Sequence, residues 1–143
     1  MPLRPLSGFE TFAVTADTGI HAWGPTLAAV FREAARGLWS LMVEDGAVEC
    51  RDWVAVSVNA GDREALLVAW LNEQLYLHEA RAFVAREWRI RSLGETALEA
   101  EVGGEGVDLS RHVVLGHVKA ATYHGLAVSP TDAGWEARVI VDV

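Results

Sequence analysis

Two aspartates near the ends of the chain, Asp17 and Asp142, carry the side chains that a hard metal ion prefers. Asp142 directly precedes Val143, so a terminal carboxylate lies beside it. If the first and last strands approach each other, both carboxylates and an oxygen of Val143 would form an all-oxygen site suited to Ca²⁺ or Mg²⁺. The alternative is ordinary, because aspartate before Thr-Gly is common in turns and aspartate at a chain end is commonly solvated.

Lys119 is the only lysine in a chain that has 11 arginines. It interrupts the apolar stretch HVKAATYHGLAV. An ammonium is a compact, titratable charge that the planar guanidinium of arginine does not replace. We therefore treat Lys119 as a functional candidate, although one lysine among twelve basic residues can also arise by chance.

Three histidines lie near Lys119 in the sequence: His112, His117 and His124. Their spacing does not indicate that their side chains meet at one site. On one strand, His117 would share a face with Lys119 while His124 would point to the opposite face. A lone histidine in a strand is more often a hydrogen-bonded structural residue than a ligand or a base.

Standard catalytic and nucleotide-binding motifs are absent from the sequence. It contains no glycine-rich phosphate loop, His-Glu-x-x-His, nucleophile elbow or Cys-x-x-Cys. The run Gly103-Gly104-Glu105-Gly106 leads into an acidic loop and not into a lysine-bearing helix, so it predicts a turn. Cys50 is the only cysteine, which excludes an internal disulfide and a cysteine-rich zinc site.

The chain is acidic, with a net charge of −8 and a pI near 5.0. Such a surface repels phosphate backbones, so we expect no direct binding of nucleic acid. Basic residues concentrate at one place only: Arg81, Arg86, Arg89 and Arg91. Arg89 and Arg91 alternate with apolar residues, and this pattern indicates a solvated strand face.

The spacing of apolar residues predicts the elements that would position these side chains. An opening hairpin is expected around a turn at residues 16–19, followed by a helix that starts at Pro25 and Thr26 and ends near Asp45 and Gly46. Asp62 is suited to cap a second amphipathic helix. Strand-like runs cover the remainder, over residues 53–58, 83–91, 97–102, 112–128 and 135–143.

The fold class predicted from these elements is α+β, a two-layer single domain over residues 1–143 with two amphipathic helices packed on a largely antiparallel β-sheet. No apolar run reaches the length of a membrane span. The first ten residues lack the apolar segment of a secretory signal, so we expect a cytoplasmic protein.

Several short motifs occur in an order that resembles the archease family. They are Thr15-Ala16-Asp17-x-Gly19, Trp70-Leu71-Asn72, Arg111-His112, Val118-Lys119-Ala120-x-Thr122-Tyr123-His124 and the terminal Asp142-Val143. Each is weak alone, but in this order they are specific together, and the resemblance covers nearly the whole chain. The resemblance implies a single archease-like domain that assists an RtcB-type RNA ligase, which joins RNA ends during tRNA splicing with GTP and a divalent metal.

The resemblance also implies roles for particular residues. Asp17, Asp142 and Val143 match the metal-binding positions of the family, with Ca²⁺ the expected ion and Mg²⁺ or Mn²⁺ as alternatives. Lys119 matches the family's Val-Lys-Ala stretch. The implied function is that of a non-enzymatic activator, which promotes guanylylation and multiple turnover of the ligase as a transient protein partner, without direct binding to nucleic acid or to a membrane.

One departure from the family pattern and two other functions remain open. Archeases commonly have an acidic residue and a histidine before Thr-Ala-Asp, where this chain has Ala13 and Val14. The metal site or the partner surface could therefore be reduced. The main alternative is a small metal-dependent hydrolase or nucleotidyl-transfer enzyme that uses Lys119, Glu105 and the Asp17/Asp142 site. A holdase-like interaction module is the third possibility.

Overall fold

The computed structural model describes residues 5–44 and 46–143, and it divides the strands between two antiparallel sheets. The five-stranded sheet has the order β1–β2–β8–β6, and β7 also pairs with β8. Its strands are β1 (Gly8–Val14), β2 (Asp17–Gly24), β6 (Ala120–Ala121), β7 (Ala127–Thr131) and β8 (Gly134–Asp142). The three-stranded sheet has the order β3–β5–β4, with β3 (Asp52–Asn59), β4 (Phe83–Leu93) and β5 (Ala97–Gly106).

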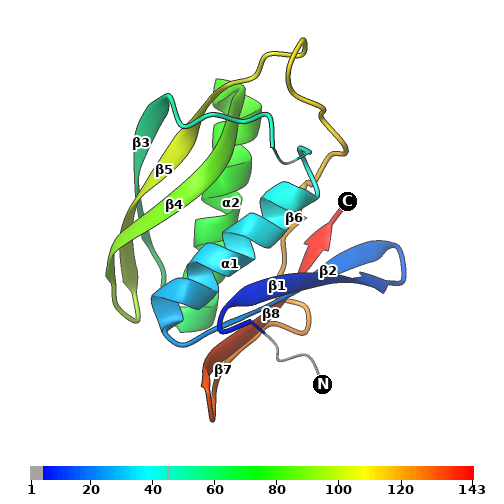
Figure 1. The fold of residues 1–143 in the computed structure, drawn as a ribbon. Coiled ribbons are helices and arrows are strands. Elements are labelled where there is room, and N and C mark those ends of the chain that lie inside the picture. Colours follow the sequence, from blue (N-terminus) through cyan, green and yellow to red (C-terminus); the bar gives the residue numbers. More distant parts are fainter. Residues whose placement is uncertain (1–4, 45) are drawn as a thin grey trace.

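Two helices, α1 (Leu27–Ser40) and α2 (Arg63–Arg81), pack against both sheets, as Figure 1 shows. One apolar cluster joins the helices and the two sheets. The predicted α+β class is confirmed, with the refinement that the strands form two sheets and not one. Among the described residues, no helix is long and apolar enough to cross a membrane.

Both helices begin where their capping residues predict. The Thr26 hydroxyl accepts a hydrogen bond from the backbone N–H of Ala29 at 3.1 Å, and the Asp62 carboxylate accepts one from Ala65 at 2.8 Å. These bonds satisfy backbone donors that have no partner inside a helix. The predicted end of the first helix involves residue 45, which lies outside the described residues, and α1 itself ends at Ser40. Residues 1–4, part of the segment predicted to lack an export signal, also lie outside them.

The opening hairpin forms as predicted, but its turn is shorter than residues 16–19. Thr15 and Ala16 make the turn, and Ala16 has a left-handed backbone with φ of 65°. Asp17 is therefore the first residue of β2 and not a turn residue. As a strand residue, Asp17 has a side-chain direction that is fixed by the alternation of side chains between the two faces of the sheet.

The prediction of a turn at Gly103–Gly106 is wrong, because these residues continue β5 to its end. A Cβ at Gly103 would lie 2.7 Å from the ring of Trp53, and a Cβ at Gly104 would overlap the backbone carbonyl of Val84. Glycine is required here by close approach within the sheet, next to a register irregularity between β4 and β5. Sequence alone gives no sign of these neighbours.

The prediction of one long strand over residues 112–128 is also wrong. Only Ala120–Ala121 and Ala127–Thr131 are strands, and Gly125 turns the chain between them with φ of 63°. Before them, the backbone pairs with the residues that follow α1: Glu44 N–H donates to Val113 and Leu115 N–H donates to Met42, both at 2.9 Å. Because these backbone groups are satisfied locally, the strand-like composition does not require a place in a sheet.

Candidate functional site at the end of the five-stranded sheet

The strand register brings the predicted site residues to one end of the five-stranded sheet. Thr18 pairs with Val141, and continuing this antiparallel register by one residue places Asp17 opposite Asp142. On the other side of β8, Ala120 pairs with Asp142, so the next position places Lys119 opposite Val143. The backbone N–H of Lys119 donates to the backbone oxygen of Asp142 at 2.9 Å. The metal hypothesis expected the first and last strands to approach each other, and it is β2, the second strand of the opening hairpin, that pairs with β8.

Both aspartates belong to the outer face of this sheet. Ile20 in β2 and Val141 in β8 are fully buried, and the alternation of side chains along a strand turns Asp17 and Asp142 to the opposite face. Each aspartate is partly exposed. Within residues 5–44 and 46–143, no side chain pairs with either carboxylate. Two like charges opposite each other on neighbouring strands are unfavourable unless a cation lies between them.

The carboxylate oxygens of Asp17 and Asp142 are of the type that a hard cation binds, but the site has few such side chains. Carboxylate oxygens are the ligands that Ca²⁺ and Mg²⁺ prefer. The described residues contain no group of three His, Cys, Asp or Glu side chains placed to hold a metal ion. The pair Asp17 and Asp142 would therefore depend on a third oxygen from Val143, with water completing the coordination.

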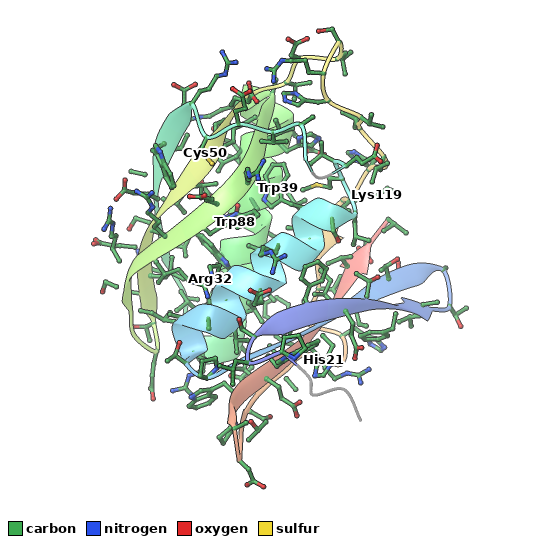
Figure 2. The ribbon with its side chains drawn as sticks, in the orientation of Figure 1. His21, Arg32, Trp39, Cys50, Trp88 and Lys119 are labelled. Atoms are coloured by element: carbon green, nitrogen blue, oxygen red, sulfur yellow. The ribbon has the colours of Figure 1, made fainter. Side chains whose placement is uncertain are left out.

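Lys119 is exposed and lies beyond the C-terminal end of α1, as Figure 2 shows. Within the described part of the chain it forms no ion pair. Its ammonium is therefore available to a partner or a ligand at the same end of the sheet as Asp142. Two of the neighbouring histidines are engaged elsewhere, because His112 is buried beside Glu105 and His117 lies 3.3 Å from the Glu79 carboxylate.

His21 is a residue of the same outer face for which sequence reasoning found no role. Its Nδ1 lies 2.9 Å from a Glu10 oxygen in β1, and its Nε2 lies 3.1 Å from a Glu136 oxygen in β8. The imidazole thereby links the two strands on either side of β2. Only the pairing of the three strands brings these groups together, so local sequence carries no signal for them.

Glu105, the acidic residue of the alternative enzymatic hypothesis, belongs to a buried ionic cluster at the end of β5. It is 4% exposed and accepts hydrogen bonds from Arg111, from the backbone N–H of Glu49 at 2.7 Å and from His112. Its hydrogen bonds with Arg111 are the main cause that lowers the pKa of Glu105 to about 2. A carboxylate held in this way anchors the loop after β5 and is poorly suited to exchange protons with a substrate.

The Glu105 cluster should make folding stability depend on pH. The folded-state pKa is about 2 and the ordinary value is 4.5, so its stabilisation is fully present above pH 4.5 and is lost as the pH falls through about 2. We expect Glu105→Gln to be less stable than wild type at neutral pH, and its stability to change less with pH across that window. Urea unfolding at a series of pH values measures both.

The exposed Glu99 on the same strand offers a matched control, because Glu99→Gln removes a carboxylate that has no partner among the described residues. Equal pH dependence in wild type, Glu99→Gln and Glu105→Gln would contradict the role given to the cluster.

Comparison with known proteins identifies the family. Residues 9–143 match the Archease protein family (MTH1598/TM1083). The chain belongs to the archease family. Protein archease of Methanosarcina barkeri is 33% identical over 139 residues, which cover 94% of this chain and 95% of that protein. Protein archease of Thermococcus gammatolerans is 34% identical, covering 94% of this chain and 98% of that protein.

A solved structure supports the same assignment at the level of the fold. The solution structure of Methanobacterium thermoautotrophicum protein 1598 has a TM-score of 0.82 and 32% sequence identity, and it covers 95% of this chain and 99% of that one. The archease match therefore rests on both sequence and fold, and its range includes Asp17, Lys119, Asp142 and Val143.

The departure from the archease pattern lies directly beside the candidate site. In the β1–β2 hairpin, Ala13 pairs with Thr18 and Val14 pairs with Asp17. Residues opposite each other share a face, so Val14 occupies the position next to the Asp17 carboxylate on the outer face. An apolar side chain there can add no ligand, which leaves the metal hypothesis dependent on Asp17, Asp142 and an oxygen of Val143.

Proposed function

We propose that this archease-family chain is a metal-binding accessory protein of an RtcB-type RNA ligase. It promotes guanylylation and multiple turnover of the ligase in tRNA splicing or RNA repair, and the chemistry stays on the ligase. The observation that carries the proposal is the sheet register that gathers Asp17, Asp142, Val143 and Lys119 at one end of the molecule.

The metal is a divalent cation, with Ca²⁺ preferred and Mg²⁺ or Mn²⁺ as alternatives. Asp17, Asp142 and an oxygen of Val143 hold it at the sheet end. The unneutralised pair of carboxylates supports this assignment, because a bound cation removes their mutual repulsion. When bound, the ion neutralises the two carboxylates, and its remaining coordination positions can take phosphate or carboxylate oxygens of the partner.

Docking of this end near the ligase active site is the proposed mode of action. Lys119, exposed beside the metal positions, contributes a flexible positive charge that helps the nucleotide take the geometry for guanylyl transfer. The net charge of −8 suits the basic surface of a protein that binds RNA. We expect a transient complex in the cytoplasm, without direct binding of nucleic acid by this chain.

RNA joining by the cognate ligase tests the proposal, with RNA in large excess over ligase and with GTP present. Wild type should convert a single round of joining into many. Asp17→Ala and Lys119→Ala should each lose most of this stimulation, because one removes a metal ligand and the other the exposed charge. Asp132→Ala is the matched control, since Asp132 is an exposed aspartate in the turn between β7 and β8.

A wild-type protein that binds the ligase without changing its turnover would overturn the accessory role. Metal-dependent hydrolysis or nucleotidyl transfer by the isolated protein, abolished by Asp17→Ala, would favour the enzymatic alternative. The engagement of Glu105 by Arg111 counts against that alternative, because the acidic group it would use is already occupied.

A further inference from the structure

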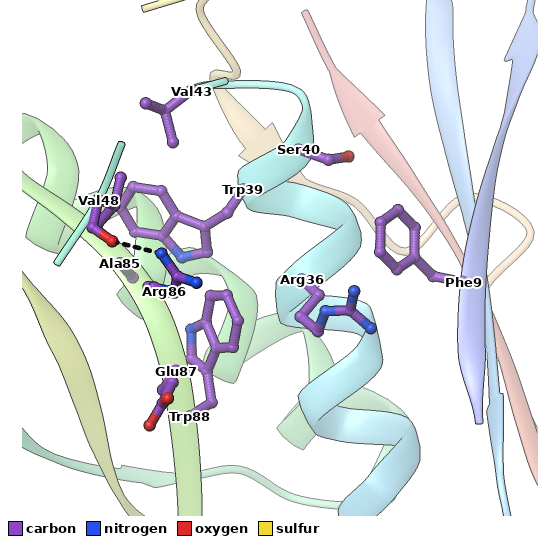
Figure 3. Close-up of a pocket in the computed structure, with 10 residues that line it drawn as sticks. All are labelled: Phe9, Arg36, Trp39, Ser40, Val43, Val48, Ala85, Arg86, Glu87 and Trp88. Atoms are coloured by element: carbon purple, nitrogen blue, oxygen red, sulfur yellow. Dashed lines mark hydrogen bonds between the residues drawn. The ribbon is translucent and has the colours of Figure 1, made fainter. Parts of the chain in front are cut away.

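A groove runs between α1 and β4, away from the sheet end described above. It consists of three adjoining hollows of about 290, 280 and 300 Å³. Trp88 lines all three, Arg36 and Arg86 line the first and third, and Arg32 and Arg89 line the second and third. None of the lining residues comes from β2, β6 or β8. Figure 3 shows the first hollow, with α1 on one side and β4 on the other.

Arginines form the walls of this groove. Five of the 11 arginines of the chain line it, two from α1 and three from β4: Arg32, Arg36, Arg86, Arg89 and Arg91. Three negative charges lie near these arginines: Glu87 lines the groove, Glu33 pairs with Arg36 and Glu101 pairs with Arg91. Five positive and three negative charges leave +2, in a chain whose net charge is −8. The groove is thus a local positive region on an acidic protein.

Several of these guanidinium groups have N–H donors to offer to a ligand. Arg32 is exposed and has no hydrogen-bond or ion-pair partner among the described residues. Arg89 stacks over the Trp53 ring of β3 at 3.9 Å to its centroid and lies 3.9 Å from a Glu87 oxygen, so its guanidinium is held over the outer face of the three-stranded sheet and not toward α1. Arg32 and Arg36 lie one helical turn apart and face in the same direction. Arg86 from β4 lines the third hollow together with both of them, so donors from a helix and from a strand flank one space, as multidentate phosphate binding requires.

The first hollow adds an apolar floor to this basic region. Trp39, Trp88, Val43 and Val48 line it, and Figure 3 shows both indoles turned toward it. Arg86 crosses its margin and donates from Nη1 to the backbone oxygen of Val48 at 2.9 Å. A ligand that fits the whole groove would have an apolar or aromatic part at this end and negative charge at the other.

We propose that the groove between α1 and β4 binds a nucleoside polyphosphate, with its base over the apolar hollow and its phosphates between Arg32, Arg36 and Arg86. Phosphates match the planar, fixed donors of arginine. The hollows exceed the volume of a single inorganic phosphate, and the apolar floor has room for one ring system. A nucleic-acid strand fits less well, because the basic part of the groove has no exposed aromatic side chains on which successive bases could stack.

Titration calorimetry with adenosine triphosphate, guanosine triphosphate and inorganic tripolyphosphate tests this site. EDTA in the buffer separates it from any metal bound at Asp17 and Asp142. We expect both nucleotides to bind, and tripolyphosphate to bind more weakly because it lacks the ring. Arg32→Gln combined with Arg86→Gln should weaken nucleotide binding by about tenfold or more.

Two further variants make the result specific. Arg81→Gln removes an exposed arginine outside the groove and should leave binding unchanged. Ser40→Phe fills the apolar hollow from the exposed end of α1, and should weaken binding of the nucleotides while leaving that of tripolyphosphate unchanged. Thermal melting establishes that each variant is folded.

Absence of binding by all three probes would overturn the proposal. So would binding that survives the Arg32→Gln/Arg86→Gln change, since the ligand would then bind elsewhere. Equal binding of tripolyphosphate and nucleotides, unaffected by Ser40→Phe, would overturn the assignment of the base to the apolar hollow. Because the groove shares no residue with the sheet end, these outcomes are independent of the ligase experiment.

Discussion

Replacement of Gln74 by methionine should lower the free energy of unfolding by about 3 kcal/mol, because it leaves two buried indole N–H groups without an acceptor. Gln74 in α2 is fully buried. Its side-chain oxygen accepts a hydrogen bond from Nε1 of Trp39 in α1 and another from Nε1 of Trp88 in β4, each at 3.0 Å. One amide oxygen thus joins α1, α2 and β4 beneath the groove.

Replacement by methionine removes the hydrogen-bond acceptor of Gln74 while changing the packing little. Methionine is unbranched, close to glutamine in length and similar in helix propensity, so little cavity or backbone cost is expected. Leaving a buried donor unsatisfied costs about 1–3 kcal/mol, and two donors are affected here. Part of this loss is offset, because the side-chain nitrogen of Gln74 is itself buried without a partner and disappears in the variant.

Urea unfolding of wild type and Gln74→Met measures the effect, with Glu73→Met as a control for the same substitution at the adjacent position in α2. Trp39→Phe removes one of the two donors, so the double variant Trp39→Phe/Gln74→Met should lose less than the sum of the two single changes. Strict additivity would mean that the Gln74 oxygen does not hold Trp39. A loss below about 1 kcal/mol for Gln74→Met would show that another acceptor satisfies the indoles.

Much of the fold is determined by local sequence, and the confirmed predictions rest on local signals. Thr26 and Asp62 mark helix starts through bonds to residues three positions later, and the spacing of apolar residues marks the faces of both helices. The predictions that are wrong concern residues whose structure depends on groups far away in the sequence. Gly103 and Gly104 must be glycine because Trp53 and Val84 approach them, and residues 113–115 lie outside the sheets because their backbone pairs with Met42 and Glu44, just after α1.

The two candidate sites differ in the same way. The metal hypothesis could be framed from sequence, since Asp17 and Asp142 lie on the first hairpin and the last strand and need only the pairing of β2 with β8. The groove between α1 and β4 could not be predicted from the sequence. The sequence predicts a solvated strand face for Arg89 and Arg91, and nothing local indicates that Arg32 and Arg36 on α1 lie across from Arg86.

Replacement of Asp142 by asparagine should have opposite effects on stability with and without calcium. Without metal, the variant should melt slightly higher than wild type, because the substitution removes the repulsion between two carboxylates opposite each other. With calcium, wild type should melt higher, because an ion that binds only the folded state stabilises it by about 2.7 kcal/mol at a concentration of 100 times Kd.

Loss of one charged ligand from a site with few ligands should weaken calcium binding by roughly tenfold or more. Calorimetric titration of calcium into wild type, Asp17→Asn and Asp142→Asn measures this directly, and Asp132→Asn serves as the control for loss of an exposed carboxylate. The two site variants should behave alike, because either change leaves a single side-chain carboxylate at the sheet end. If calcium raises the melting temperature of all four proteins equally, the ion binds elsewhere and the sheet end is not the metal site.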